Sequence, residues 1–336
     1  MGRLLALAMS KGIRVKGISL NWVVDTATNT PTLPASDLAA LRSSGARMAR
    51  VDLHLGGHES WSPPLIAAYR SAVHSLEAAG LQVLGLLGSG IVAGASQEKW
   101  NTNNAENGGS GWNPFLDRYT SAARTVISAF PQISHWEVWN EPNAWTSHTG
   151  TVYHGGNYIY PSLYAALLGN LYPLIQSIQP SATVVTGGLF AHDNAGDLSR
   201  DNSGTSYLDS VYSLVGSPVP FDVIGMHYYI DQGGALVPEH LQRYLNMLLE
   251  TISYYEHNPS RPVYITEAGW STRSVSESVQ SSNLSAFYEV LNLNRFVQVR
   301  LWFQIRDNPG GSQYYGLRHA DGTPKPSFAA FQAVPS

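Results

Sequence analysis

Residues 136–143 read Trp-Glu-Val-Trp-Asn-Glu-Pro-Asn, and this stretch is the most informative in the chain. Its first four residues have the composition of a buried strand, and Pro142 ends the strand because proline lacks the N–H that a sheet requires. Side chains alternate along a strand, so Asn140 and Glu141 can share a face only if the backbone turns there. A carboxylate at the end of a buried strand is costly unless it is paired or has a chemical task.

The rest of the chain repeats this arrangement of a short strand followed by a helix, and eight such units can be counted. Most of the strand candidates are almost continuously apolar, as parallel strands covered on both faces are. The predicted strands cover residues 14–20, 47–53, 82–87, 135–139, 183–189, 222–228, 263–267 and 299–304. The predicted helices cover residues 36–44, 63–79, 114–129, 161–178, 206–215, 237–256, 277–293 and 326–333.

Eight strand–helix units in sequence favour a closed (β/α)8 barrel, the TIM barrel, over an open doubly wound sheet. Asn21 and Trp22 follow the first strand, where a nucleotide-binding fold carries a glycine-rich phosphate loop. No linker or change in composition divides the chain, so we expect residues 1–336 to form one barrel domain. The segments that follow strands, such as 89–113 and 141–160, are long, which predicts a functional rim at the C-terminal ends of the strands.

Composition excludes several classes of protein. With 43% hydrophobic and 13% charged residues the chain is not disordered, and a net charge of −4 without charged blocks argues against nucleic acid or an anionic membrane as partner. The absence of cysteine excludes disulfides and thiol catalysis, but it is compatible with a secreted and with a cytoplasmic protein. The apolar run 4–9 is too short for a signal peptide, and no run is long enough to cross a membrane. The oligomeric state stays open.

A second glutamate ends another predicted strand. Residues 264–270 read Tyr-Ile-Thr-Glu-Ala-Gly-Trp, so Glu267 follows an apolar run as Glu141 does. By the strand count these glutamates end strands 4 and 7, whose C-terminal ends face one central mouth. Hydrolysis of a glycosidic bond requires two such carboxyl groups, one to protonate the leaving oxygen and one to meet the developing oxocarbenium ion. The alternative is that each glutamate caps a helix or pairs with an arginine.

Asn140, Glu141 and Pro142 after strand 4, together with Glu267 on strand 7, resemble clan A of the glycoside hydrolases, near its family 39 and family 5 branches. Members of that clan are retaining (β/α)8 enzymes with the acid/base on strand 4 and the nucleophile on strand 7. The resemblance implies that Glu141 is the acid/base and Glu267 the nucleophile of a double displacement through a covalent glycosyl-enzyme.

The resemblance also implies roles for neighbouring residues. Asn140 would bind the sugar 2-hydroxyl, and Arg50 at the end of strand 2 would support the nucleophile. His227 and Tyr229 match a His-x-Tyr pattern on strand 6, in which the tyrosine donates to the nucleophile. Trp302 on strand 8 would lie under the sugar at the cleavage point. An arginine and a tyrosine hydroxyl beside Glu267 would favour its ionised form. The chain departs from many relatives in having no histidine on strand 3.

Aromatic side chains in the predicted rim loops suit a carbohydrate cleft, because sugar rings present C–H faces to aromatic rings. The further substrate-binding candidates from this group are Trp22, Trp145 and Trp270. His54 and His58 are four residues apart, but the intervening Gly56 and Gly57 argue against a helical zinc pair. We therefore expect neither a metal nor a cofactor.

The expected function is hydrolysis of β-linked glycosides, with glucosides, xylosides or β-glucans as substrates and an oligo- or polysaccharide as binding partner. One alternative is a carbohydrate-binding barrel without hydrolytic activity. Another is a metal-dependent lyase or isomerase, which needs ligand clusters or a lysine base at the strand ends. The lysines fall outside the strand ends (Lys11, Lys16, Lys99 and Lys325).

Overall fold

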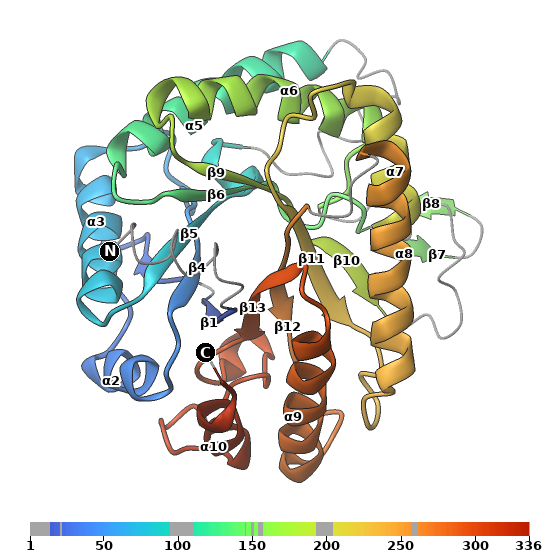
Figure 1. Ribbon diagram of the computed structural model, residues 1–336. Helices are drawn as coiled ribbons and strands as arrows, with labels where there is room; N and C mark the ends of the chain where they lie inside the picture. The colour runs from blue at the N-terminus through green and yellow to red at the C-terminus, as the bar shows by residue number, and fades with distance from the viewer. Residues whose placement is uncertain are drawn as a thin grey trace.

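The structure is a computed structural model, and it describes residues 14–20, 22–94, 111–144, 146–148, 151–153, 157–192, 204–256 and 261–335. Its centre is a barrel of parallel strands surrounded by a ring of helices (Figure 1). The strands that build the barrel are β1 (Val15–Leu20), β4 (Met48–Asp52), β5 (Gln82–Leu87), β6 (His135–Val138), β9 (Thr183–Thr186), β10 (Leu189–His192), β11 (Ile224–Tyr229), β12 (Val263–Ala268) and β13 (Val297–Phe303).

The barrel closes between its fifth and sixth strands. The sheet order is β10-β11-β12-β13-β1-β4-β5-β6-β9, so β9 and β10 stand at the two ends of the order although they follow each other in the chain. They are the lower and upper parts of one barrel strand: β9 pairs with β6, β10 pairs with β11, and a bridge joins Val185 to Val223. The predicted (β/α)8 TIM barrel is therefore confirmed.

The helices follow the strands in the predicted order. They are α2 (Ala35–Ser43), α3 (Pro63–Ala78), α5 (Trp112–Ala129), α6 (Pro161–Ile178), α7 (Gly204–Val215), α8 (Pro238–Glu256), α9 (Glu277–Leu293) and α10 (Pro326–Ala333). Local signals fix several of their starts. Ser62 caps α3 by accepting from the Leu65 N–H, and Pro63 occupies the first turn, where its missing N–H costs nothing.

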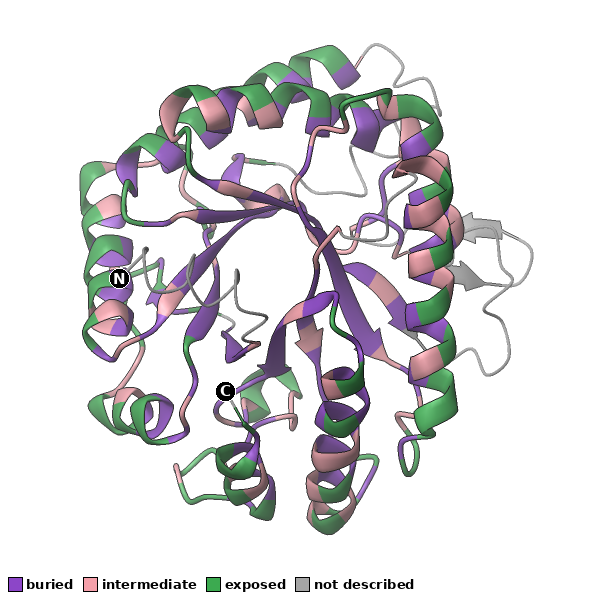
Figure 2. Cartoon of the chain, viewed as in Figure 1, coloured by how far each residue is buried: buried purple, intermediate pink, exposed green. Residues whose placement is uncertain are grey.

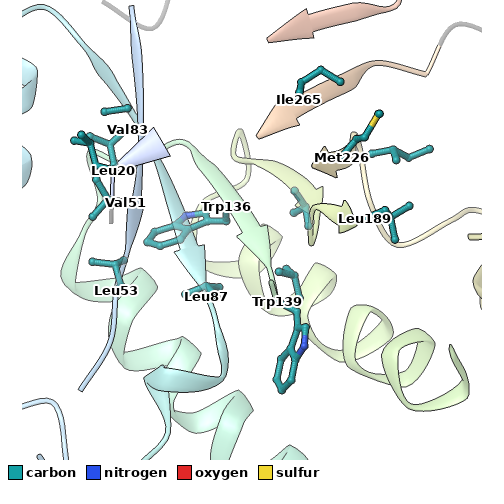
Figure 3. Packing of buried hydrophobic residues seen from close by; sticks show 14 of the residues in the cluster. Leu20, Val51, Leu53, Val83, Leu87, Trp136, Trp139, Leu189, Met226 and Ile265 are labelled. Carbon is teal, nitrogen blue, oxygen red and sulfur yellow. The ribbon is translucent and has the colours of Figure 1, made fainter. Parts of the chain in front are cut away.

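Apolar side chains fill the barrel from both sides. The inner layer of the barrel floor consists of Val15, Met48, Leu84, Val185, Val223, Tyr264, Val299 and Leu301. The outer faces of the strands pack against the helices, and Figure 3 shows Leu20, Val51, Trp136 and Ile265 among these side chains. The strands are accordingly buried almost throughout, while each helix is buried on one face and exposed on the other (Figure 2).

The rim at the C-terminal ends of the strands carries additional short elements that the sequence analysis did not predict. These are the hairpin β2 (Val24–Asp25) and β3 (Thr30–Pro31), the hairpin β7 (Thr146–His148) and β8 (Thr151–Tyr153), and the 3-10 helices η1 (Ser89–Ile91) and η2 (Pro309–Gly311). The elaboration of this one rim agrees with the long loops expected there. Among the described helices, none combines the length and the apolar composition needed to span a bilayer.

Candidate active site

The two glutamates singled out from the sequence meet at the mouth of the barrel, where the C-terminal ends of the strands open. Glu267 lies on β12, and Glu141 lies three residues beyond the end of β6. One carboxylate oxygen of Glu141, one of Glu267 and a ring nitrogen of His227 all lie within 4.8 Å of one another. The barrel therefore brings together side chains that are 126 positions apart in the numbering (267 minus 141).

A backbone turn after β6 aims Glu141 into the mouth. Trp139 and Glu141 have positive φ angles of 73° and 47°. Residues other than glycine rarely adopt this backbone conformation, and it often marks a functional site. Buried contacts hold the turn: Trp139 Nε1 donates to the Asn157 carbonyl at 2.7 Å. Asn143 Nδ2 donates to the Phe190 carbonyl at 3.0 Å and its Oδ1 accepts from the Phe190 N–H at 2.7 Å. The turn expected from the strand alternation is thus present.

Arg50 on β4 connects the polar groups of the mouth. Its Nη1 donates to Glu267 Oε1, its Nη2 donates to Asn140 Oδ1 at 2.7 Å, and its Nε donates to Glu137 Oε2. Only 3% of the residue is exposed. Burial acts to lower the pKa of Arg50, but the negative charges of Glu137 and Glu267 outweigh it and raise the pKa above its ordinary value. The guanidinium is therefore a permanent cation beside Glu267.

Glu137 is a site residue that the sequence analysis did not identify. It is completely buried on β6 below the two glutamates of the mouth. In addition to the Arg50 guanidinium, it accepts from the Gly188 N–H at 2.8 Å and from Thr266 Oγ1 at 3.2 Å. A carboxylate inside an otherwise apolar strand was the signal that could have revealed it, because such a group must be paired. The layer formed by Glu137, Glu267 and Arg50 holds two carboxylates for one guanidinium.

Tyr229 binds the other oxygen of Glu267. Its hydroxyl donates to Glu267 Oε2 at 2.8 Å, so each carboxylate oxygen of Glu267 accepts one hydrogen bond, from Arg50 or from Tyr229. Burial, followed by the charge on Glu267, raises the pKa of Tyr229 well above its usual range. The tyrosine consequently keeps its proton at neutral pH and is the donor in the hydrogen bond.

Glu141 has a different set of partners. His227 Nδ1 lies 2.8 Å from Glu141 Oε1, and Asn157 Nδ2 donates to Glu141 Oε2 at 3.4 Å. Burial acts to lower the pKa of His227, but the charges of Glu267 and Glu141 and the hydrogen bond to Glu141 outweigh it, so the pKa of His227 is raised. Among the described residues, His227 Nε2 has no hydrogen-bond partner. Glu141 is thus paired with a group that can itself gain or lose a proton.

The aromatic residues predicted to bind a sugar differ in their exposure to solvent. Trp302 is completely buried, donates through Nε1 to the Tyr315 carbonyl, and stacks on the equally buried Trp270 at 6.0 Å. These two positions correct the prediction that both rings face a sugar. The reason is register, because Val299 and Leu301 face the barrel interior and the alternation then turns Trp302 outwards.

Phe303 is the inward-facing aromatic residue at the end of β13. It packs edge-on against Tyr315 at 5.5 Å, and Tyr315 packs edge-on against Tyr229 at 5.9 Å. Trp22, in contrast, is 63% exposed at the rim. Trp145 lies outside the described residues.

The oxygen and nitrogen atoms of Glu141, His227 and Glu267 are close enough to offer ligands to a cation. However, His227 Nδ1 is engaged with Glu141, and both Glu267 oxygens already accept hydrogen bonds. The donor set therefore fits proton transfer and nucleophilic attack better than metal binding.

Comparison with known proteins shows that the fold occurs in other solved structures. A scan of family models gives no match, and a search of curated proteins gives none either. Similar solved structures include a family 39 glycoside hydrolase from the gut symbiont Bacteroides cellulosilyticus WH2, with a TM-score of 0.63 and 18% identity over 96% of this chain and 64% of that chain. The chain thus spans less than two thirds of that relative.

Two further solved structures have the same fold over most of their length. GH5_18 from Streptomyces cattleya in complex with Manβ1-4GlcNAc has a TM-score of 0.68 and 16% identity, over 95% of this chain and 79% of that chain. Xylanase 10B from Thermotoga maritima has a TM-score of 0.63 and 16% identity, over 97% of this chain and 96% of that chain. At such identities the likeness establishes the fold, a (β/α)8 barrel that these glycoside hydrolases also have.

Proposed function

We propose that the protein is a retaining glycoside hydrolase that cleaves β-linked glycosides, with residues 1–336 acting as one catalytic domain. The observation that carries the proposal is the pair Glu141 and Glu267, two carboxylates close together at the barrel mouth with unequal partners. In retaining enzymes the carboxyl groups lie about 5–5.5 Å apart, and in inverting enzymes about 6.5–9.5 Å apart. Oxygens within 4.8 Å of each other support the retaining mechanism.

In the first step, Glu267 attacks the anomeric carbon and forms a glycosyl ester. The bond between that carbon and the leaving oxygen breaks, and Glu141 transfers its proton to the leaving oxygen. Arg50 and Tyr229 support this role of Glu267 because both hydrogen bonds favour its ionised, nucleophilic form. Asn140, whose Oδ1 accepts from Arg50, would bind the sugar hydroxyl next to the reacting carbon.

In the second step, Glu141 accepts a proton from water as the water oxygen attacks the anomeric carbon. The ester bond to Glu267 breaks, which restores both carboxyl groups to their starting states. The ester has no charge on Glu267, so the electrostatic reason for Glu141 to hold a proton is weaker in the intermediate. His227, hydrogen-bonded to Glu141, supports the exchange because its own protonation follows the charge on the two glutamates.

We infer that the substrate is a β-linked glucoside, xyloside or β-glucan. The solved structures that share the fold include a xylanase and an enzyme in complex with Manβ1-4GlcNAc, which supports this class of ligand. The other candidate is a barrel that binds carbohydrate without hydrolysing it. Two closely spaced glutamates with complete sets of partners favour the hydrolase.

The role of Glu141 is tested with a series of aryl glycosides whose leaving groups differ in acidity. Glu141→Ala should lose activity mainly on substrates with poor leaving groups, because only these need a proton to depart. Glu250→Ala, on the exposed face of α8, is the matched control and should behave as the wild type. Equal losses on good and poor leaving groups would contradict the role of Glu141 as the acid.

The role of Glu267 is tested by removing its carboxylate. Glu267→Gly should abolish turnover of every glycoside, and added azide should restore part of it by occupying the vacated space and attacking the anomeric carbon. The product should be a glycosyl azide of inverted configuration, which nuclear magnetic resonance identifies. Full activity of this variant without azide would refute the proposed function.

A further inference from the structure

A cavity opens on the same rim of the barrel as the proposed active site. Its volume is about 870 Å³, near the upper end of the range of about 300–1,000 Å³ typical of ligand sites. It lies at the C-terminal ends of β1, β4 and β13, and its walls include Leu20, Trp22, His54 and Gln304. The β2–β3 hairpin contributes Val24 and Asp25.

The cavity lies beside the strands whose ends carry the groups around Glu267. Ser19, next to the wall residue Leu20, lies 3.4 Å from Arg50 Nη1 through its hydroxyl. Gln304 follows the inward-facing Phe303, and His54 lies two residues beyond the end of β4, the strand that carries Arg50. A ligand bound at Glu141 and Glu267 therefore has a neighbouring space into which a longer chain can extend.

Apart from Asp25, which accepts from the Ala27 N–H, the Asp and Arg side chains of the cavity wall are held in ion pairs. Asp37 pairs with Arg306 at 3.3 Å and with Arg318 at 2.7 Å, and Asp307 pairs with Lys325 at 2.8 Å. Paired charges have little attraction for an ion, and the carboxylate of Asp25 repels an anion. What remains for a ligand is this one carboxylate, a set of neutral polar groups and an aromatic ring, which suits a neutral, hydroxyl-rich molecule.

Trp22 provides the aromatic surface. It is 63% exposed, and it is the only tryptophan among the described residues that is largely exposed. Its backbone is held by the Thr32 hydroxyl, which donates to the Trp22 carbonyl at 2.9 Å, and its ring lies 5.8 Å from that of His54. An exposed indole on the wall of a cavity offers the apolar face on which the C–H groups of a sugar ring can pack.

We propose that this cavity is a saccharide-binding site continuous with the active site, in which Trp22 stacks on a sugar ring beyond the two that flank the cleaved bond. The substrate is accordingly an oligo- or polysaccharide of several β-linked units rather than a simple glycoside. This inference rests on the proposed function, because it extends the substrate of the same catalytic centre.

The kinetic test compares a short and a long substrate. For Trp22→Ala, the kcat/KM for cellopentaose or xylopentaose should fall about tenfold more than that for the corresponding nitrophenyl β-glycoside, since truncation of a tryptophan anchor commonly costs this much. Tyr254→Ala is the control, because Tyr254 is 72% exposed on α8, outside the cavity wall. It should leave the ratio of the two values as in the wild type. A Trp22→Ala ratio equal to that of the wild type would overturn the proposal.

A binding measurement separates this inference from the proposed function. In the Glu267→Gln background, calorimetry should show that the pentasaccharide binds at least tenfold more tightly than the disaccharide, and that Trp22→Ala removes this advantage. If Trp22→Ala removes the tighter binding of the pentasaccharide but the wild type hydrolyses no glycoside, the proposed hydrolase function is refuted and the saccharide site is supported. Equal affinity for both saccharides in both backgrounds, in a protein that does hydrolyse glycosides, would refute the saccharide site alone.

Discussion

Glu137 is completely buried and compensates part of the charge balance around Arg50. It is one of two carboxylate partners of the buried guanidinium, and it also fixes the Gly188 N–H and the Thr266 hydroxyl. Removing one member of a buried ion pair leaves the other charge uncompensated, which typically costs about 3–5 kcal/mol. Arg50 is expected to move towards Glu267 when this partner is lost.

Glu137→Gln should lower the free energy of unfolding by about 3 kcal/mol and reduce kcat more than it changes KM. Urea unfolding measures the first effect and steady-state kinetics the second. Glu250→Gln, on an exposed helical face, is the control and should change neither. A Glu137→Gln variant with wild-type stability would show that Glu137 is not needed to balance the charge of Arg50.

Tyr229→Phe should lower kcat at least tenfold on every glycoside. The variant removes the hydroxyl that donates to Glu267 Oε2 at 2.8 Å, and a hydrogen bond to a charged group is worth about 1.5–3 kcal/mol. Because the loss falls on the nucleophile, it should be similar for aryl glycosides with good and with poor leaving groups, which steady-state kinetics measures. A loss confined to substrates with poor leaving groups would contradict the pairing of Tyr229 with Glu267.

The sequence was sufficient to find the residues that lie at strand ends within short motifs, and the structure brings Arg50, Asn140, His227 and Tyr229 together with the two glutamates. Their roles in turnover remain predictions. Register limited the prediction elsewhere. Side chains alternate between the two faces of a strand, so an error of one residue assigns the wrong face. The prediction placed Trp302 inside the barrel, where Phe303 lies, and missed Phe303. Glu137 was missed because its partners Arg50, Gly188 and Thr266 come from three distant parts of the chain, which no local pattern reveals.

Among the elements, the helices were predicted to within two residues at either end, since proline and glycine mark their boundaries. The helix predicted for residues 161–178 matches α6 at both ends. The hairpins of the rim were missed because strands of two or three residues have no detectable periodicity. The predicted strand 183–189 is split into β9 and β10 by Gly187 and Gly188.

Gly188, between β9 and β10, lies directly against His227 of the candidate active site. A Cβ atom added there would lie 2.1 Å from the imidazole of His227, which must shift to accommodate it. Gly188→Ala should therefore displace His227 from Glu141 and lower kcat at least tenfold, at a cost in stability of about 1–3 kcal/mol.

The control for Gly188→Ala is Gly169→Ala in α6, where an added Cβ meets no atom within 4 Å. It should preserve activity and raise the free energy of unfolding by up to about 1 kcal/mol, because alanine favours a helix over glycine. Steady-state kinetics and thermal unfolding of both variants provide the comparison. Undiminished kcat in Gly188→Ala would mean that the position of His227 is unimportant.

At the scale of the whole molecule, the rim opposite the active site joins the first strand of the barrel to the last helix. Lys16 on β1 is buried and donates to the carbonyls of Phe331 at 2.8 Å, Gln332 at 3.2 Å and Val334 at 2.6 Å, at the end of α10. Burial, followed by the nearby charges of Arg300 and Arg47, lowers the pKa of Lys16 from 10.5 to about 8.

Because of this lowered pKa, the contribution of Lys16 to stability should increase between about pH 8 and pH 10.5. In that interval the folded protein has released the proton and the unfolded chain still holds it, so the unfolding free energy rises with pH. Comparing urea unfolding of the wild type and of Lys16→Met at several pH values isolates this contribution. A difference between the two proteins that does not grow with pH would contradict the assignment.

The layer of two carboxylates and one guanidinium at the barrel mouth has a consequence for inhibitors. With Glu137 and Glu267 ionised, Arg50 neutralises only half of the negative charge held in a water-poor space. A sugar-shaped cyclic amine carries a proton on its ring nitrogen and so presents a cation where the oxocarbenium ion forms. Such an amine should inhibit far better than a neutral carbocycle of the same shape. Its inhibition constant should rise at alkaline pH, as the ring nitrogen loses its charge.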